Sequence, residues 1–164
     1  MILALFGTNP YPFERLVEFL ETLAREEGHE IVVQHGSSRA PDGCQSFDYT
    51  SYQRILDLMA KADVVVAQGG YGSSLDALTL GRPLVLVPRL RAMAESLDDQ
   101  VELVRHLTAS GRALSAQTYP EFAAAIAQAL SATGGEAGDQ EQPFGQAVAQ
   151  AILDHLEKNG TLPI

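Results

Sequence analysis

The chain has 164 residues, of which 46% are hydrophobic and 20% charged, and its formal net charge is −10 at pH 7. This length predicts one domain with a substantial core, and the acidity disfavours nucleic acid and anionic lipid as direct partners. The one cysteine, Cys44, leaves no internal disulfide or cysteine metal cluster and suits a reducing compartment. No signal peptide and no apolar run near the ~20 residues of a membrane span are evident. We therefore expect a cytoplasmic protein.

Apolar runs alternate with helical patterns along the chain. Short apolar runs bounded by turn residues predict strands at residues 2–6, 31–33, 47–49, 64–67, 83–88 and 112–115. Apolar positions at helical spacing predict helices at residues 13–27, 52–61, 73–80, 98–110 and 121–130. Gly28 and Gly111 are expected to end two of these helices, and Asp98 to cap one.

This alternation predicts an α/β fold with a Rossmann-like parallel sheet and helices on both faces. The whole chain, residues 1–164, is expected to form one domain. Its core would cover about residues 1–130. A Gly/Glu/Gln-rich mobile linker is expected at about 131–142, and a terminal helix at about 143–159.

A glycine-rich turn follows the fourth predicted strand. Three glycines in residues 69–72 allow a sharp turn and a close approach to a ligand, and Ser73 and Ser74 follow where a helix begins. An ordinary strand-to-helix connection remains the alternative interpretation. A P-loop is set aside because the turn has no lysine. A dinucleotide fingerprint is disfavoured because Leu75 replaces its third glycine and the next strand ends in Pro88 and Arg89 instead of an acid.

Four predicted strand ends carry residues that suit a ligand. In parallel sheets ligands bind at the carboxyl ends of the strands, so these segments should meet at one edge of the sheet. The four segments are residues 7–9, 34–38, 68–74 and 88–100.

Residues 62–89 (ADVVVAQGGYGSSLDALTLGRPLVLVPR) resemble the donor-binding signature of family 28 glycosyltransferases. The resemblance extends to four further segments: residues 6–8, 12–17, 33–38 and 97–103. Within that family the chain resembles free-standing donor-binding subunits. One is the PssE-like subunit of bacterial exopolysaccharide synthesis. The other is the soluble subunit of the eukaryotic two-chain enzyme that adds the second N-acetylglucosamine to dolichol-linked saccharide.

The resemblance implies a GT-B enzyme of which this chain is the C-terminal, donor-binding half. Contacts to the UDP diphosphate are then expected from Thr8, Gly70, Gly72, Ser73 and Ser74. Contacts to the ribose and uracil are expected from Asp76 and from the backbone at Phe47 and Asp48. Contacts to the donor sugar are expected from Asp99 and Gln100. The family often has histidine where this chain has Gln68.

Arg89 and Arg91 suggest a separate hypothesis about the sugar. Two arginines in a strand-end loop of an acidic protein can bind a diphosphate or a carboxylate bidentately. If the donor is UDP-glucuronate, one of them would recognise the uronate. A solvated loop or a contact with a partner subunit is the alternative.

The predicted function is therefore the catalytic subunit of a two-component, inverting UDP-glycosyltransferase, transferring a hexosyl or glucuronosyl group. The resemblance implies a membrane-anchored partner subunit that holds a polyprenyl-diphosphate-linked saccharide, as in exopolysaccharide assembly. The partner would supply the general base and recruit the chain to the cytoplasmic face of the membrane. No metal and no cofactor are expected. A non-catalytic UDP-sugar-binding module and a fragment resembling UDP-sugar epimerases are the alternatives.

Overall fold

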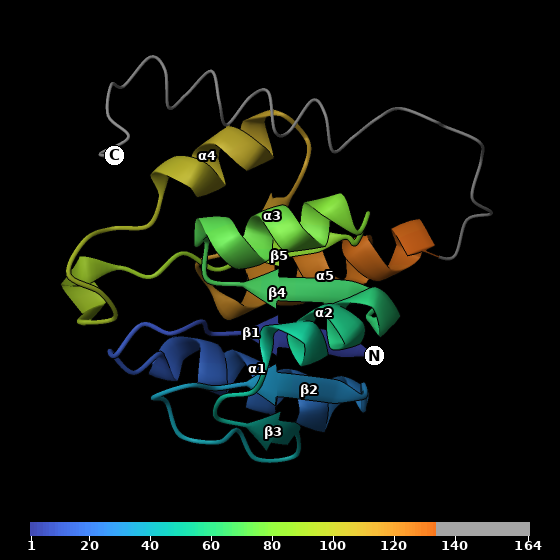
Figure 1. The fold of residues 1–164 in the computed structure, drawn as a ribbon, viewed down its shortest axis with the longest axis horizontal. Coiled ribbons are helices and arrows are strands. Elements are labelled where there is room, and N and C mark those ends of the chain that lie inside the picture. Colours follow the sequence, from blue (N-terminus) through green and yellow to red (C-terminus); the bar gives the residue numbers. More distant parts are fainter. Residues whose placement is uncertain (134–164) are drawn as a thin grey trace.

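In the computed structural model, which describes residues 1–133, the chain forms an open six-stranded sheet with helices on both faces (Figure 1). All strand pairs are parallel, and the strand order is β3-β2-β1-β4-β5-β6. The predicted α/β fold with a Rossmann-like sheet is confirmed. The strands are β1 (Ile2–Leu5), β2 (Ile31–Gln34), β3 (Gln45–Phe47), β4 (Val64–Ala67), β5 (Leu84–Leu86) and β6 (Leu114–Ser115).

Five α-helices and one short 3₁₀ turn connect these strands or follow them in residues 1–133. They are α1 (Glu14–Glu27), α2 (Tyr52–Lys61), α3 (Tyr71–Thr79), the 3₁₀ turn η1 (Arg91–Met93), α4 (Glu102–Ala109) and α5 (Tyr119–Thr133). The last helix extends three residues beyond the predicted core boundary at 130. The rest of the predicted linker and the predicted terminal helix at 143–159 lie outside the described residues.

The core has two layers, one on each face of the sheet. Successive strand side chains point to opposite faces, so Ile2 and Ala4 pack with α1 and α5, while Leu3 and Leu5 pack with α2, α3 and α4. Every residue of β1, β2 and β4 is buried. Burial on both faces explains why these strands have nearly continuous apolar sequences instead of an alternating pattern.

The strand order creates a switch point between β1 and β4. From β1 the chain adds β2 and β3 on one side, then returns to the other side to add β4, β5 and β6. The segments that leave the carboxyl ends of β1 and β4 therefore diverge and leave a crevice. Such switch points are where open α/β sheets bind ligands.

Several predicted boundaries differ from the observed ones by one to four residues, among them the start of α3, which is Tyr71 and not Ser73. Two further differences concern β3 and α4. The third strand is Gln45–Phe47, two residues earlier than predicted. The prediction of Asp98 as a helix cap is wrong, because α4 begins at Glu102 after Val101. The residues between Asp98 and Glu102 instead form hydrogen bonds with the segment that precedes them. The N–H of Arg91 donates to Asp99 Oδ1 (2.8 Å), and the N–H of Gln100 donates to the Arg89 carbonyl (3.2 Å).

Within residues 1–133, no helix has the length and apolar character needed to cross a membrane.

Candidate functional site

A cavity of about 310 Å³ lies at the carboxyl edge of the sheet, beside the switch point. Its walls come from the ends of β1 and β2, from the connection between β3 and α2, and from the first turns of α2 and α3. Most of the lining residues are polar or aromatic. They are Leu5, Gly7, Thr8, Gln34, Tyr49, Thr50, Tyr52, Ile55, Gly72, Ser73 and Asp76.

The N-terminus of α3 offers unpaired hydrogen-bond donors to this cavity. Gly70 is the N-cap and has no side chain that could accept from the first turn. The N–H of Ser74 is the first to bond within the helix, to the Gly70 carbonyl (3.4 Å). Within residues 1–133, the N–H groups of Tyr71, Gly72 and Ser73 have no hydrogen-bond acceptor. Together with the helix dipole, three free amides favour an anion at this position.

The glycines of the turn have different roles. Gly69 has φ +91°, and a Cβ added there would lie 2.7 Å from Val104 Cγ2 and 3.1 Å from the Gln100 carbonyl oxygen. The fold therefore requires glycine at position 69. A Cβ added at Gly72 would have no atom within 4 Å. Gly69 thus serves the strand-to-helix connection, and Gly72 leaves open space at the cavity.

Asp76 lines the cavity one turn beyond these free amides. Tyr52, which comes from α2, donates its hydroxyl to Asp76 Oδ1 (2.8 Å). The hydrogen bond to this carboxylate raises the pKa of Tyr52 above its ordinary value. No described residue donates to the second carboxylate oxygen of Asp76, which is therefore available to hydroxyl groups of a ligand.

Gln34 holds the first glycine loop in place, a role that its position in the predicted strand-end segment 34–38 did not indicate. Its side chain is 6% exposed and exchanges two hydrogen bonds with the backbone of Gly7 (3.0 and 3.1 Å). It also donates to the carbonyl of Asp48 (2.8 Å). The sequence did contain a signal for this role, namely a polar amide side chain at the end of an apolar strand. Such a group is buried and must find hydrogen-bond partners in the adjoining loops.

The segment containing Phe47 and Asp48 is arranged differently from the expectation. The carbonyl of Phe47 accepts from the His35 N–H (2.9 Å), and the carbonyl of Asp48 accepts from Gly36 and Gln34. These carbonyls therefore hold β2 and its loop. The residues of this segment that line the cavity are the next two, Tyr49 and Thr50. These two residues could be identified as lining residues only from the three-dimensional path of the loop.

Asp99, Gln100 and Arg91 lie outside the cavity lining, on the segment between β5 and α4. The Gln100 carbonyl oxygen lies close to Gly69, and its side-chain Oε1 is buried without a partner among the described residues. A buried acceptor without a donor is uncommon in native proteins and marks a place where a ligand can complete the hydrogen bonding. The side chain of Arg91 is exposed.

Two of the predicted contact residues are not accessible. Ser74 is 1% exposed, and its hydroxyl donates to the Gly70 carbonyl (2.7 Å). Arg89 is also 1% exposed, and its guanidinium donates to the carbonyls of Phe6, Tyr11 and Glu95 and to Gln68 Oε1. Both side chains are therefore buried, and the groups they use for hydrogen bonding are paired within the protein. The hypothesis that Arg89 binds the donor sugar directly is therefore corrected, because its donors are already used inside the protein.

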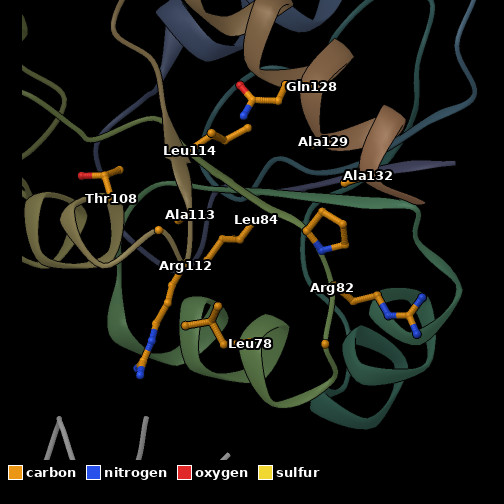
Figure 2. Close-up of a pocket in the computed structure, with 13 residues that line it drawn as sticks. Leu78, Arg82, Leu84, Thr108, Arg112, Ala113, Leu114, Gln128, Ala129 and Ala132 are labelled. Carbon is orange, nitrogen blue, oxygen red and sulfur yellow. The ribbon is translucent and has the colours of Figure 1, made fainter. Parts of the chain in front are cut away.

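A second hollow of about 750 Å³ lies at the opposite, amino edge of the sheet. Figure 2 shows it between the C-terminal ends of α3, α4 and α5 and the starts of β5 and β6. Arg82, on its wall, donates to the carbonyls of Leu80 (3.1 Å) and Ala62 (3.4 Å). The helices around it present carbonyl ends, which disfavour anions. Despite its smaller volume, the cavity at the carboxyl edge is therefore the better candidate site for an anionic ligand.

Among residues 1–133, no group of three or more His, Cys, Asp or Glu side chains is placed to hold a metal ion. Thr8, Gly72, Ser73 and Asp76 are brought together around one cavity, with Gly70 next to it as the N-cap.

Comparisons with known proteins identify the family and the fold. The profile of the glycosyltransferase family 28 C-terminal domain matches residues 1–152. The NDP-glycosyltransferase YjiC of Bacillus licheniformis is 26% identical over an alignment of 119 positions that covers 68% of this chain and 28% of that protein.

Two solved structures illustrate the likeness in fold. Acinetobacter baumannii MurG superposes with a TM-score of 0.57 at 18% identity, over 96% of this chain and 49% of that one. The UDP-GlcNAc 2-epimerase of Methanocaldococcus jannaschii, in complex with UDP-GlcNAc and UDP, gives a TM-score of 0.61 at 12% identity, over 97% and 45% of the two chains. At these identities the likeness shows the fold alone. This chain spans less than half the length of each of the three proteins.

Proposed function

Because the chain belongs to the glycosyltransferase family 28 C-terminal domain family, we propose that it binds a UDP-sugar as the donor half of a two-component, inverting glycosyltransferase. Its partner would be a membrane-anchored subunit holding a polyprenyl-diphosphate-linked saccharide, in exopolysaccharide assembly. The lipid-linked acceptor and this biosynthetic context rest on the resemblance to PssE-like and dolichol-pathway subunits. The partner would also recruit the chain to the cytoplasmic face of the membrane.

The observation that carries the proposal is the donor-rich N-terminus of α3 beside a cavity at the switch point. The free amides of Gly72 and Ser73, with the exposed hydroxyl of Thr8, suit the oxygens of a diphosphate. Asp76 offers a carboxylate oxygen to the ribose hydroxyls. As the bond to the sugar breaks, negative charge grows on the departing UDP. The same amides and helix dipole would stabilise that charge in the transition state.

A rim of exposed apolar side chains supports a second component. Six large hydrophobic side chains of residues 1–133 are at least 36% exposed, and all six follow the carboxyl ends of β3, β4 or β5. They are Tyr49, Tyr52, Tyr71, Leu75, Met93 and Leu97. Exposed apolar residues gathered around a functional cleft favour a covering protein surface. A cavity of about 310 Å³, at the lower end of the usual range for small-molecule sites, also suits a site whose other wall comes from a partner.

The chemistry of the lining residues supports a general base on the partner. Among the described residues that line the cavity, Asp76 is the one carboxylate, and it already accepts from Tyr52. We assign it to the ribose, so the activation of an acceptor hydroxyl is left to the acceptor-binding subunit.

The segment between β5 and α4 is the proposed contact for the donor sugar. The unpartnered Oε1 of Gln100 suits a sugar hydroxyl as its donor, and Asp99 lies beside it. The exposed Arg91 remains the candidate for a uronate carboxylate. If it has this role, Arg91→Ala should weaken UDP-glucuronate at least fivefold more than UDP-glucose. Equal losses for the two sugars would contradict it.

Calorimetric titration of UDP into the full chain tests donor binding, with Asp76→Asn expected to lower the affinity about tenfold. The chain is then purified with the protein encoded beside it, and UDP-sugar turnover is measured with a polyprenyl-diphosphate saccharide. Transfer by the pair but not by the isolated chain is the expected result. A wild-type chain that does not bind UDP would overturn the proposal.

A non-catalytic UDP-sugar-binding module is the second candidate, favoured by the finding that Asp76 is the one carboxylate among the described residues that line the cavity. In that case the reconstituted pair would bind UDP without turnover. Conversion of UDP-N-acetylglucosamine to its 2-epimer by the chain would instead favour an epimerase-like function.

A further inference from the structure

Arg89 lies directly behind the proposed diphosphate site. It follows β5, yet its guanidinium bonds to residues that follow three different strands. It donates to the carbonyls of Phe6 (3.1 Å) and Tyr11 (2.8 Å) after β1, to Gln68 after β4, and to the carbonyl of Glu95 (2.9 Å) after β5. One side chain thus ties together the loops at both sides of the switch point.

The hydrogen-bond partners of Arg89 are all neutral, although it is a fully buried cation. The neighbouring carboxylate of Glu95 is bound in a fork by Arg15 (2.9 and 2.8 Å) and also accepts from the N–H of Leu90. The ring of Phe13 lies 4.4 Å from the guanidinium and adds a cation–π contact. Burial lowers the pKa of Arg89 to about 10, so it remains charged at neutral pH. Burying such a charge is costly, and its position behind the ligand loops gives a reason for it.

The bond to Arg89 fixes the orientation of the Gln68 amide. Because Oε1 of Gln68 accepts from the arginine, its Nε2 group is turned the other way, toward Gly7 and Gly70. A Cβ added at Gly70 would lie 3.5 Å from Nε2, and one added at Gly7 would collide with it. Within residues 1–133, Nε2 of Gln68 has no acceptor.

We propose that Arg89 is a positioning residue for the diphosphate site, where it holds the amide of Gln68 with its N–H donors between the two glycine loops. This inference rests on the proposed function. Without the arginine, the amide can rotate and present its oxygen, which repels a phosphate. The buried charge also adds positive potential directly behind Gly7.

The test uses Gln68→Glu, which keeps the contact with Arg89 and replaces only the N–H donors. A glutamate here can pair with the buried cation, so the thermal midpoint should be unchanged or higher. UDP affinity should fall at least tenfold by calorimetry. Uridine binding is followed by NMR chemical shifts, which can measure millimolar dissociation constants. The dissociation constant for uridine should stay within twofold of the wild-type value. Gln45→Glu, on the exposed edge strand β3, carries the same charge change as the matched control and should leave both ligands within twofold.

Arg89→Met is the second variant, with the exposed Arg105→Met on α4 as its control. If Arg89→Met folds, its affinity for UDP should fall at least tenfold and its affinity for uridine less than twofold. Adding Gln68→Ala to this variant should lower the affinity for UDP little further. The inference is overturned if Gln68→Glu binds UDP like the wild type, or if it weakens UDP and uridine equally. A wild-type chain that binds neither ligand overturns the proposed function, and this inference with it.

Discussion

The two edges of the sheet differ in how completely their polar groups are satisfied. At the amino edge, Arg82 bonds to backbone carbonyls and the helices end in carbonyl groups, which disfavour an anion, although Arg112 also lines this larger hollow. At the carboxyl edge, three amides of α3 and the Oε1 of Gln100 lack partners among the described residues. The comparison favours the carboxyl edge for an anionic ligand, because it offers unpaired donors although its cavity is the smaller of the two.

The strongest test of this comparison places a charge at each end of the same helix. Ser73→Asp puts a carboxylate in the first turn of α3, where it favours the helix but repels a diphosphate. We expect UDP affinity to fall at least about 100-fold (about 2.7 kcal/mol) with unchanged or slightly higher thermal stability. Calorimetry and thermal unfolding measure the two effects.

The matched control is Thr79→Asp at the other end of α3, toward the amino edge. It should cost about 0.5 kcal/mol of stability, because an acid opposes the dipole at a helix C-terminus, and leave UDP affinity within twofold. If both variants weaken UDP alike, the carboxyl edge is not the anion site.

A second test distinguishes the structural role of Gly69 from the ligand-binding role proposed for Gly72. Gly69→Ala adds a methyl group 2.7 Å from Val104 Cγ2 at φ +91°, and we expect a loss of about 2–3 kcal/mol in unfolding free energy. Gly72→Ala adds a methyl group in open space within the first turn of α3. It should stabilise the fold by about 0.5 kcal/mol and weaken UDP about tenfold. Urea unfolding and calorimetry measure both, and a stable Gly69→Ala variant would contradict the structural role of Gly69.

The smallest effect is expected at an ion-pair network that belongs to neither edge. Arg39 donates to Glu14 and Glu21, and the N–H of Asp42 also donates to Glu21 (2.9 Å). The side-chain bond from Arg39, followed by the Asp42 amide, lowers the pKa of Glu21 to about 2. The stabilisation is therefore complete above about pH 4.5, the ordinary value for glutamate, and is lost as the pH falls toward 2.

Arg39→Ala should cost less than about 1 kcal/mol at pH 7, because the pair is largely solvent-screened. Its difference from the wild type should shrink between pH 4.5 and pH 2 in urea unfolding. A difference that stays constant over this range would exclude Glu21 as the titrating group.

Strands buried on both faces were predictable from the sequence because their signal is local. The apolar run of β4 was predicted with its observed bounds, and Gly28 ends α1 in the left-handed conformation as expected. The exposed edge strand β3 was displaced by two residues, since a short polar edge strand has no apolar pattern to fix its position. The start of α4 was misplaced because Asp98 does not cap the helix, which begins at Glu102, while the adjacent Asp99 accepts from the N–H of Arg91.

The site was predictable as a set of loops but not as a set of contacts. Thr8, Gly72 and Asp76 were selected from motif positions and do line the cavity. The burial of Ser74 and Arg89, and the roles of Gln34 and Tyr52, depend on which side chains from distant strands meet. A strand-end arginine has the same local sequence whether it faces solvent or the interior. Its environment is set by the loops after β1 and β4, more than 20 residues away in the chain.

The order of the strands also has a consequence for folding. Every residue that lines the cavity lies between Leu5 and Asp76, whereas Arg89 comes later in the chain. During synthesis from the N-terminus, the walls of the cleft therefore emerge before the guanidinium that joins them. We expect the final rigidity of the cleft to wait for β5, so that in ribosome-bound chains of increasing length the β1 and β2 amides should be protected from hydrogen exchange before the N–H of Ala116, which bonds to β5.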